Sequence, residues 1–102
     1  MNNGRQEMLE SLCDKLLACS QSLEKAGNFT TAGVFRGCHK SLQNKPLEFQ
    51  KTPLKTLLSY NSRAFDYDQI SYPQTEEIND IRDLVKKILK LLKVEHPNLF
   101  QE

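Results

Sequence analysis

Three cysteines and two histidines are the side chains of this sequence best suited to nucleophilic or metal chemistry. Cys38 and His39 are adjacent, and a thiol needs a base within hydrogen-bond reach to become an activated nucleophile. Neighbouring side chains in a helix point about 100° apart, so this pair is predicted not to form. The remaining Cys13, Cys19 and His96 complete no CxxC or HxxxH spacing, and we expect no metal site.

All three cysteines stand among apolar residues in stretches that read as helix. We interpret them as reduced, half-buried thiols that act as small hydrophobic side chains. Reduced thiols are typical of a reducing compartment, so we expect a cytoplasmic protein.

Two pairs of acidic residues, Asp66/Asp68 and Glu76/Glu77, are the other candidates for catalysis. Acids in a loop and in a first helical turn usually serve as caps and solvated charge. The sequence has no glycine-rich phosphate loop and no G-x-S-x-G motif. We therefore expect a protein that is not an enzyme and takes no cofactor. An enzyme that uses the scattered acidic residues and His39 is an alternative. Loss of activity after substitution of His39 or Cys38 would support it.

Four lysines crowd the second half of the last predicted helix: Lys86, Lys87, Lys90 and Lys93. Near a helix C-terminus they complement the helix dipole, at about 0.3–1 kcal/mol per charge. Two interpretations stay open: a solvated face, or a patch that meets anionic headgroups or an acidic partner. Nucleic acid is not an expected partner, because the net charge is only +1 and the first half of this helix is acidic.

Two large apolar residues reappear in the tail 94-VEHPNLFQE-102. Pro97 prevents the helix from continuing, and Asn98 suits a turn. Leu99 and Phe100 follow, although a disordered end is usually polar. We expect this pair to fold back as a lid, to recognise a partner, or to do both. The candidate partner-binding residues are thus Lys86, Lys87, Lys90, Lys93, Leu99 and Phe100.

The hydrophobic periodicity of the sequence predicts the helices that position these residues. Apolar residues at steps of three and four predict helices over residues 5–26, 29–43, 53–66 and 72–94. The predicted inward faces include Leu17 in the first helix and Phe29 in the second. The last helix has the clearest pattern, with Ile78, Ile81, Val85, Ile88 and Leu92.

Helix boundaries are marked by short local signals. Gly27 ends the first helix, and Asn28 can cap the second. Thr52 followed by Pro53 predicts an N-cap and first helical position for the third helix. The last helix is preceded by a capping box with its first residue at Ser71.

Two features of the middle of the chain predict packing. Gly33 and Gly37, four residues apart, leave a smooth strip against which another helix can pack closely, although each lowers helix propensity by about 1 kcal/mol. In the connector after the second helix, Leu47 and Phe49 are predicted to plug one end of the core.

These observations predict one domain over residues 1–102, folded as an antiparallel up-down four-helix bundle with a short irregular C-terminal tail. No stretch shows the period-two alternation of a strand. The first residues lack the apolar segment of a signal peptide, and no apolar run approaches the ~20 residues that span a bilayer.

The segment 42-LQNKPLEFQKTPLKTLLSYNSRAFDYDQISYPQTEEINDIRDL-84 resembles the immunity proteins against pediocin-like (class IIa) bacteriocins, in particular the enterocin A immunity type. The resemblance covers about the second half of the chain. The first half is similar only in having two amphipathic helices. The matching elements are Leu42, Leu47, Pro53-Leu54, Leu57-Leu58, Tyr67, Ile70, Tyr72, Glu76-Glu77 and Leu84.

This resemblance implies a cytoplasmic bundle without enzymatic activity that protects a Gram-positive producer cell from its own bacteriocin. The implied partner is a membrane receptor of the mannose phosphotransferase type with bound bacteriocin, recognised from the cytoplasmic side. Peripheral contact with the inner membrane surface is also implied. Specificity is attributed to the C-terminal half in such proteins, which here includes the four lysines, Leu99 and Phe100.

A different class of function stays open beside this one. A helical-bundle adaptor or regulatory protein that binds a protein partner would have the same amphipathic helices. A neighbouring gene for a small secreted peptide with a double-glycine leader would favour immunity over the adaptor.

Overall fold

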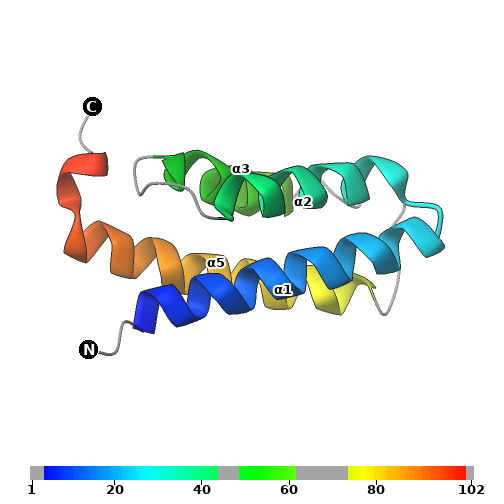
Figure 1. Ribbon diagram of the computed structural model, residues 1–102, viewed down its shortest axis with the longest axis horizontal. Coiled ribbons are helices and arrows are strands. Elements are labelled where there is room, and N and C mark those ends of the chain that lie inside the picture. Colours follow the sequence, from blue (N-terminus) through cyan, green and yellow to red (C-terminus); the bar gives the residue numbers. More distant parts are fainter. Residues whose placement is uncertain (1–3, 44–48, 62–73, 101–102) are drawn as a thin grey trace.

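The computed structural model describes residues 4–43, 49–61 and 74–100. Its elements are α1 (Gly4–Lys25), α2 (Phe29–Leu42), α3 (Lys51–Asn61), α5 (Gln74–Glu95) and the short 3-10 helix η2 (Pro97–Phe100). No strand occurs in these ranges. The predicted all-α four-helix bundle is confirmed (Figure 1).

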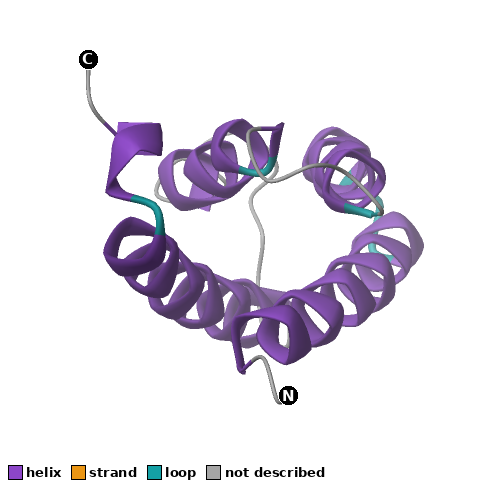
Figure 2. Ribbon diagram, turned by 60° about the vertical axis from the view of Figure 1, so that its left-hand side comes forward, coloured by secondary structure: helices purple, strands orange, loops and turns teal. Residues whose placement is uncertain are grey.

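The helices surround a common centre, with neighbours in the chain also neighbours in space (Figure 2). α1 packs against α2 and α5, and α3 packs against the same two helices from the other side. α1 runs opposite to both α2 and α5 (Figure 1). η2 turns back at the end of α5 and packs against it. The end of α5 therefore meets both η2 and α3, where the candidate residues lie.

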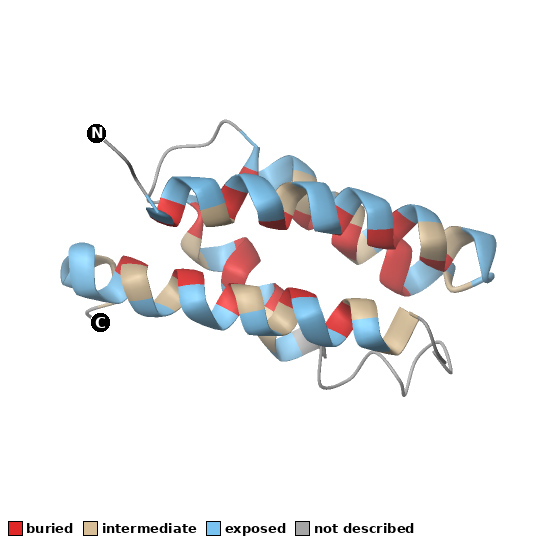
Figure 3. Ribbon diagram, turned by 90° about the horizontal axis from the view of Figure 1, so that it is seen from below, coloured by how far each residue is buried: buried red, intermediate tan, exposed pale blue. Residues whose placement is uncertain are grey.

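The core consists of the faces that the four helices turn toward one another (Figure 3). The predicted stripe of α5 is fully buried, as are Leu12, Leu16 and Leu23 of α1. Phe35 is the largest fully buried side chain among the described residues. Each such side chain stabilises the fold by about 1.5–3 kcal/mol relative to an exposed position.

The predicted end of the first helix at Gly27 is confirmed. Gly27 has φ +86°, a left-handed conformation that glycine adopts without steric cost. The amide of Asn28 donates to the carbonyl of Leu23 at 2.8 Å, and that of Gly27 donates to Glu24 at 3.0 Å. This is the Schellman arrangement, which satisfies carbonyls at the end of α1.

Asn28 occupies the N-cap of α2 as predicted, but its side chain makes no capping hydrogen bond. Its backbone carbonyl accepts the amide of Ala32 at 3.1 Å. The turn imposed by Gly27 therefore starts α2 without help from the asparagine side chain.

The predicted start of the third helix was two residues late. α3 begins at Lys51, and the carbonyl of Gln50 accepts the amide of Leu54 at 3.2 Å. Thr52 therefore lies inside the first turn instead of capping it. Pro53 still fits, because the amides of a first turn have no partner within the helix.

Three apolar residues predicted to face the core are exposed: Leu17 at 39%, Phe29 at 68% and Phe49 at 61%. Leu17 lies beside the buried stripe of α1, while Phe29 and Phe49 stand at or before helix starts, beyond the packed faces. The predicted close packing at Gly33 and Gly37 is also wrong. Both are exposed, and a Cβ added at either would meet no atom within 4 Å.

Several predictions fall on residues outside the described ranges. These include Leu47 in the connector, the last residues of the predicted helix 53–66, and the capping box at Ser71. Within the described ranges, no helix combines the length and apolar character needed to cross a lipid bilayer.

Candidate functional site

A groove with a volume of about 520 Å³ lies where α3, α5 and η2 meet. It combines lysine side chains with a smaller number of apolar ones. Its lining residues are Lys55 and Leu58 of α3, Lys86, Leu89, Lys90 and Lys93 of α5, and Phe100 of η2. Its volume falls within the range of about 300–1,000 Å³ typical of ligand sites, but it is open to solvent along its length.

The lysines of α5 line the groove because of their spacing. Lys86, Lys90 and Lys93 are four and three residues apart, so they follow one another along a single edge of the helix. All three are exposed. Leu89, on the groove side of the same helix, is half-buried and packs against the core. We call the half-buried Leu58 and Leu89 the floor of the groove and the exposed lysines its rim.

The opposite wall is formed by Lys55 and Leu58 of α3. Leu58 lies at the groove with Lys86 and Leu89, while Lys51 at the start of α3 reaches η2 beyond the end of α5. α3 and α5 are therefore antiparallel. This direction places Lys55 opposite the lysines of α5 and makes both walls basic.

The tail closes one end of the groove. Lys51 donates a hydrogen bond from Nζ to the carbonyl of Leu99, and its Nζ lies 5.1 Å from the centre of the Phe100 ring. The Nζ of Lys55 lies 5.8 Å from the same ring. Both distances are within the range of cation–π attraction. Leu99 and Phe100 are half-buried against the core, so their predicted lid-like folding is observed.

Among the described residues, no acidic side chain forms an ion pair with a lysine of the groove. The ion pairs of the described residues join Arg5 to Glu95 and Arg36 to Glu24, and neither involves a groove lysine. An anionic group that binds among these lysines would interact favourably with all of their charges. The site is therefore suited to bind carboxylates or phosphates next to an apolar surface.

The structure brings together most of the candidate residues that the sequence indicated. Lys86, Lys90, Lys93 and Phe100 line the groove, and Leu99 lies beside them. Lys87 is exposed but does not line it, because one residue further along a helix the side chain points about 100° away.

Sequence reasoning missed Lys51, Lys55 and Leu58 as part of this site. The signal was a pair of lysines four residues apart at the start of the third helix. It was missed because Lys51 was placed outside that helix, and because proximity to the tail depends on tertiary packing.

A second hollow, of about 230 Å³, lies between α1 and α2 and includes Cys13 and His39. His39 donates from Nδ1 to the backbone carbonyl of Cys13 at 3.0 Å, so this nitrogen is directed at the backbone. Cys38 points elsewhere and donates from Sγ to the carbonyl of Pro53 at 3.9 Å. The prediction that Cys38 and His39 do not face each other is confirmed.

The thiols have the electrostatics of buried structural groups. Burial, reinforced by Asp14 and Glu10, raises the pKa of Cys13 above its usual range. Burial also raises the pKa of Cys38 to about 11, while burial and then Glu77 raise that of Cys19 to about 12. A catalytic thiolate requires the opposite shift. All three thiols are free, and no cluster of three or more metal-binding side chains occurs in the described part of the chain.

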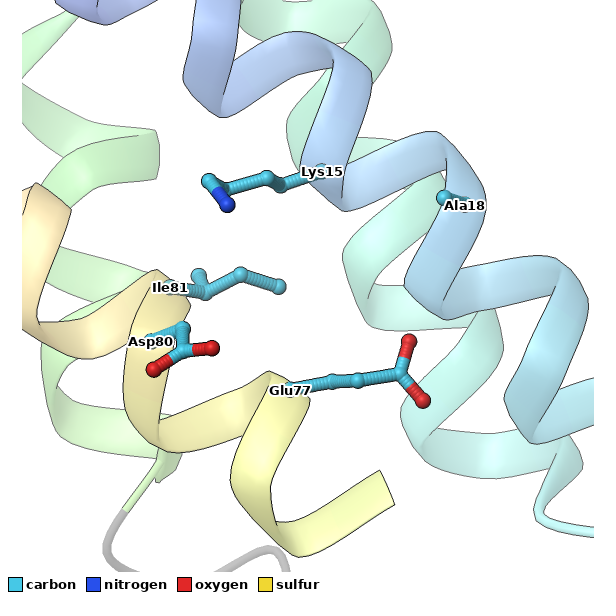
Figure 4. Close-up of a pocket in the computed structure, with 5 residues that line it drawn as sticks. All are labelled: Lys15, Ala18, Glu77, Asp80 and Ile81. Atoms are coloured by element: carbon cyan, nitrogen blue, oxygen red, sulfur yellow. The ribbon is translucent and has the colours of Figure 1, made fainter. Parts of the chain in front are cut away.

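Glu77, in the first turn of α5, has a structural partner. Glu77 accepts a hydrogen bond from Ser22 at 3.2 Å, and Ser22 accepts one from Gln74 at 3.0 Å. Figure 4 shows Glu77 and Asp80 beside a hollow of about 120 Å³ that also contacts Lys15. This volume is below that of ordinary ligand sites. The other acidic pair, Asp66/Asp68, lies outside the described residues.

No known protein family, curated protein or solved structure matches this sequence. The groove and the resemblance stated from the sequence are therefore the two grounds for the function proposed below.

Proposed function

We propose that this protein is an immunity protein against a pediocin-like bacteriocin. It binds the complex of the bacteriocin with a membrane receptor of the mannose phosphotransferase type, from the cytoplasmic side. Binding, without any catalytic step, then blocks the pore that would otherwise kill the cell. The protein is located in the cytoplasm and reaches the inner membrane surface through this receptor.

The observation that carries the proposal is the assembly of Lys86, Lys90, Lys93 and Phe100 around one groove. In the immunity proteins that this sequence resembles, specificity is attributed to the C-terminal half, which here includes these residues. A four-helix scaffold with a basic, partly apolar groove at that place provides a surface for a protein partner.

The test is protection of a sensitive cell. The chain is expressed in the cytoplasm of a bacteriocin-sensitive Gram-positive strain, which is challenged with a panel of pediocin-like peptides beside an empty-vector control. We expect the inhibitory concentration to rise strongly for one or a few of the peptides. Immunoblotting confirms that the protein is present in the cell. If it is present and protects against none of the peptides, the proposal is contradicted, and an adaptor that uses the same groove for another protein is favoured.

Variants connect protection to the groove. Lys86→Ala/Lys90→Ala/Lys93→Ala is expected to lose protection. Its matched control is Lys25→Ala/Lys40→Ala/Lys87→Ala, which removes the same charge from exposed positions outside the groove. Leu99→Ala/Phe100→Ala is also expected to lose protection while keeping the helical circular dichroism spectrum. Unfolding of that variant would make the pair structural, and full protection would remove it from the mechanism.

A further inference from the structure

The shape of the groove restricts the kinds of partner that fit it. Its apolar floor, Leu58 and Leu89, is half-buried and lies in the same groove as the lysines of α3 and α5. A lipid surface would bind the lysines through headgroup charge and gain little from Leu58 and Leu89, because both are already half-buried. Val94, 75% exposed, is the only large exposed apolar side chain in the described part of α5. The surface therefore lacks the row of protruding apolar residues by which amphipathic helices enter a membrane.

The lysine spacing indicates the geometry of the partner. Lys86, Lys90 and Lys93 follow one edge of α5 over about 10 Å, from seven residues at a rise of 1.5 Å each. Acidic side chains four and three residues apart on another helix repeat this spacing. A helix lying along the groove would therefore place carboxylates beside successive lysines and turn its neighbouring apolar side chains toward Leu58 and Leu89.

From these observations we infer that the groove binds an amphipathic helix that carries an acidic stripe beside large apolar side chains. The inference rests on the proposed function, of which it specifies the partner's recognition element: an acidic helical segment exposed on the cytoplasmic side of the receptor complex. The groove of about 520 Å³ accepts the apolar side chains of that helix, while its backbone stays above the lysine rim.

Phe100 determines how far such a helix can extend. Its ring closes the groove on the side of η2 and is held by Lys51 and Lys55. Lys55 faces both the ring and the groove, so a carboxylate bound to Lys55 competes with the ring for the same ammonium group. Binding of the acidic helix is therefore expected to alter the environment of Phe100.

The probe is a synthetic amphipathic helix with three glutamates at spacings of four and three residues and leucines along one flank. Its binding to the full chain is measured by fluorescence anisotropy at low and at raised salt. The control peptide has glutamine in place of each glutamate. We expect salt-sensitive binding of the acidic peptide and at least about tenfold weaker binding of the glutamine peptide, since three ion pairs are lost.

The same variants test the location. Lys86→Ala/Lys90→Ala/Lys93→Ala should weaken the binding of the acidic peptide at least about tenfold. Lys25→Ala/Lys40→Ala/Lys87→Ala, with the same net charge, should bind it within about twofold of the unmodified protein. Equal weakening by both variants would show that only total charge matters and would overturn the inference. The amide resonances of residues 99 and 100 should shift on binding.

Two other occupants would give different results. Lysine-dependent binding to phosphatidylglycerol–phosphatidylcholine vesicles, without binding of the peptide, would assign the groove to a lipid surface and overturn the inference. A second copy could contribute Glu76, Asp80 and Asp83, which have the same spacing on α5. Sedimentation equilibrium tests this alternative. A salt-sensitive dimer that does not bind the peptide, and that is absent in Lys86→Ala/Lys90→Ala/Lys93→Ala, would also overturn the inference.

The inference and the proposed function can fail separately. Binding of the acidic peptide in the groove, with no protection against any bacteriocin, would keep the partner chemistry and reject the immunity function. Protection that survives Lys86→Ala/Lys90→Ala/Lys93→Ala would keep the immunity function and reject the groove as its recognition site.

Discussion

The ammonium group of Lys51 lies 5.1 Å from the centre of the Phe100 ring and also donates a hydrogen bond to the carbonyl of Leu99. One side chain at the start of α3 thus contacts both apolar residues of the tail, Leu99 and Phe100, which follow the turn at Pro97. The position of η2 depends on a cation from a different helix, in addition to the apolar contacts of the tail with the core.

Substitution of Lys51 should loosen the tail without unfolding the bundle. Lys51→Met removes the cation and the hydrogen bond, which together are worth about 1–2 kcal/mol at a partly exposed site. The amide of Leu99, which donates to the carbonyl of His96 at 3.1 Å, should then exchange at least several-fold faster by NMR. Lys55→Met, whose Nζ is 5.8 Å from the ring, is the control and should have a smaller effect. Unchanged exchange in Lys51→Met would show that apolar packing alone holds η2.

The sequence predicted the helices well where periodicity and burial agree. Every residue of the α5 stripe from Ile78 to Leu92 is buried, because each step of three or four returns to the same face. Phe29 and Phe49 show the limit of this reasoning. Their residue type predicts burial, but their positions at helix starts lie beyond the packed faces, which only the tertiary arrangement determines.

The candidate site was predictable in part for a similar reason. Local spacing on one helix placed Lys86, Lys90 and Lys93 along one edge. The opposite wall, Lys55 and Leu58, comes from α3, and its approach to α5 depends on contacts between residues far apart in sequence. The exclusion of Lys87 from that edge follows from the same helical spacing, since its side chain points about 100° away from that of Lys86.

The ion pair between Arg5 and Glu95 should show unequal effects of its two partners. Arg5 Nε donates to Glu95 Oε1 at 2.7 Å and joins the start of α1 to the end of α5. Arg5 is buried, at 7% exposure, and its NH1 atom has no hydrogen-bond partner, whereas Glu95 is 42% exposed. Glu95→Ala leaves a buried cation unpaired and should cost about 1–3 kcal/mol. That is below the value for a fully buried pair, because water reaches Glu95. Arg5→Met replaces the cation with a buried apolar side chain and should cost less than about 1 kcal/mol.

Urea denaturation at neutral pH measures these differences. The double variant Arg5→Met/Glu95→Ala should be closer in stability to Arg5→Met than to Glu95→Ala, because the unpaired cation is gone. The exposed pair of Arg36 with Glu24 is the comparison, and its removal should cost less than about 1 kcal/mol. Equal destabilisation by Arg5→Met and Glu95→Ala would contradict this account.

Replacement of the helical glycines should stabilise the protein. Gly33 and Gly37 lie inside α2, are exposed, and have open space where a Cβ would stand. Alanine at either site reduces the conformational freedom of the unfolded chain and should raise the free energy of unfolding by about 0.5–1 kcal/mol. Thermal and urea denaturation measure the gain. Gly27→Ala is the control and should destabilise, because φ is +86° there. Destabilisation by Gly33→Ala would contradict the open space found around this position.

The buried thiols should make the protein less stable at alkaline pH. Burial and Glu77 raise the pKa of Cys19 to about 12, and burial raises that of Cys38 to about 11, from an ordinary value of 9.0. Below pH 9 both states keep these protons, so the full stability is present. Above it the unfolded chain releases them first, and stability is lost up to the folded pKa values. Together the two thiols should lower the free energy of unfolding by about 2 kcal/mol between pH 9 and 10.

Urea denaturation under reducing conditions at pH 8, 9 and 10 tests this dependence, since each titration acts on the folding equilibrium. Cys19→Ala/Cys38→Ala lowers stability at every pH because it leaves small cavities in the core, so the informative quantity is the slope with pH. The comparison of the two slopes isolates the contribution of Cys19 and Cys38. Between pH 9 and 10, the free energy of unfolding of the double variant should fall by about 2 kcal/mol less than that of the unmodified protein. Equal slopes would show that the two thiols ionise as easily in the folded protein as in the unfolded chain.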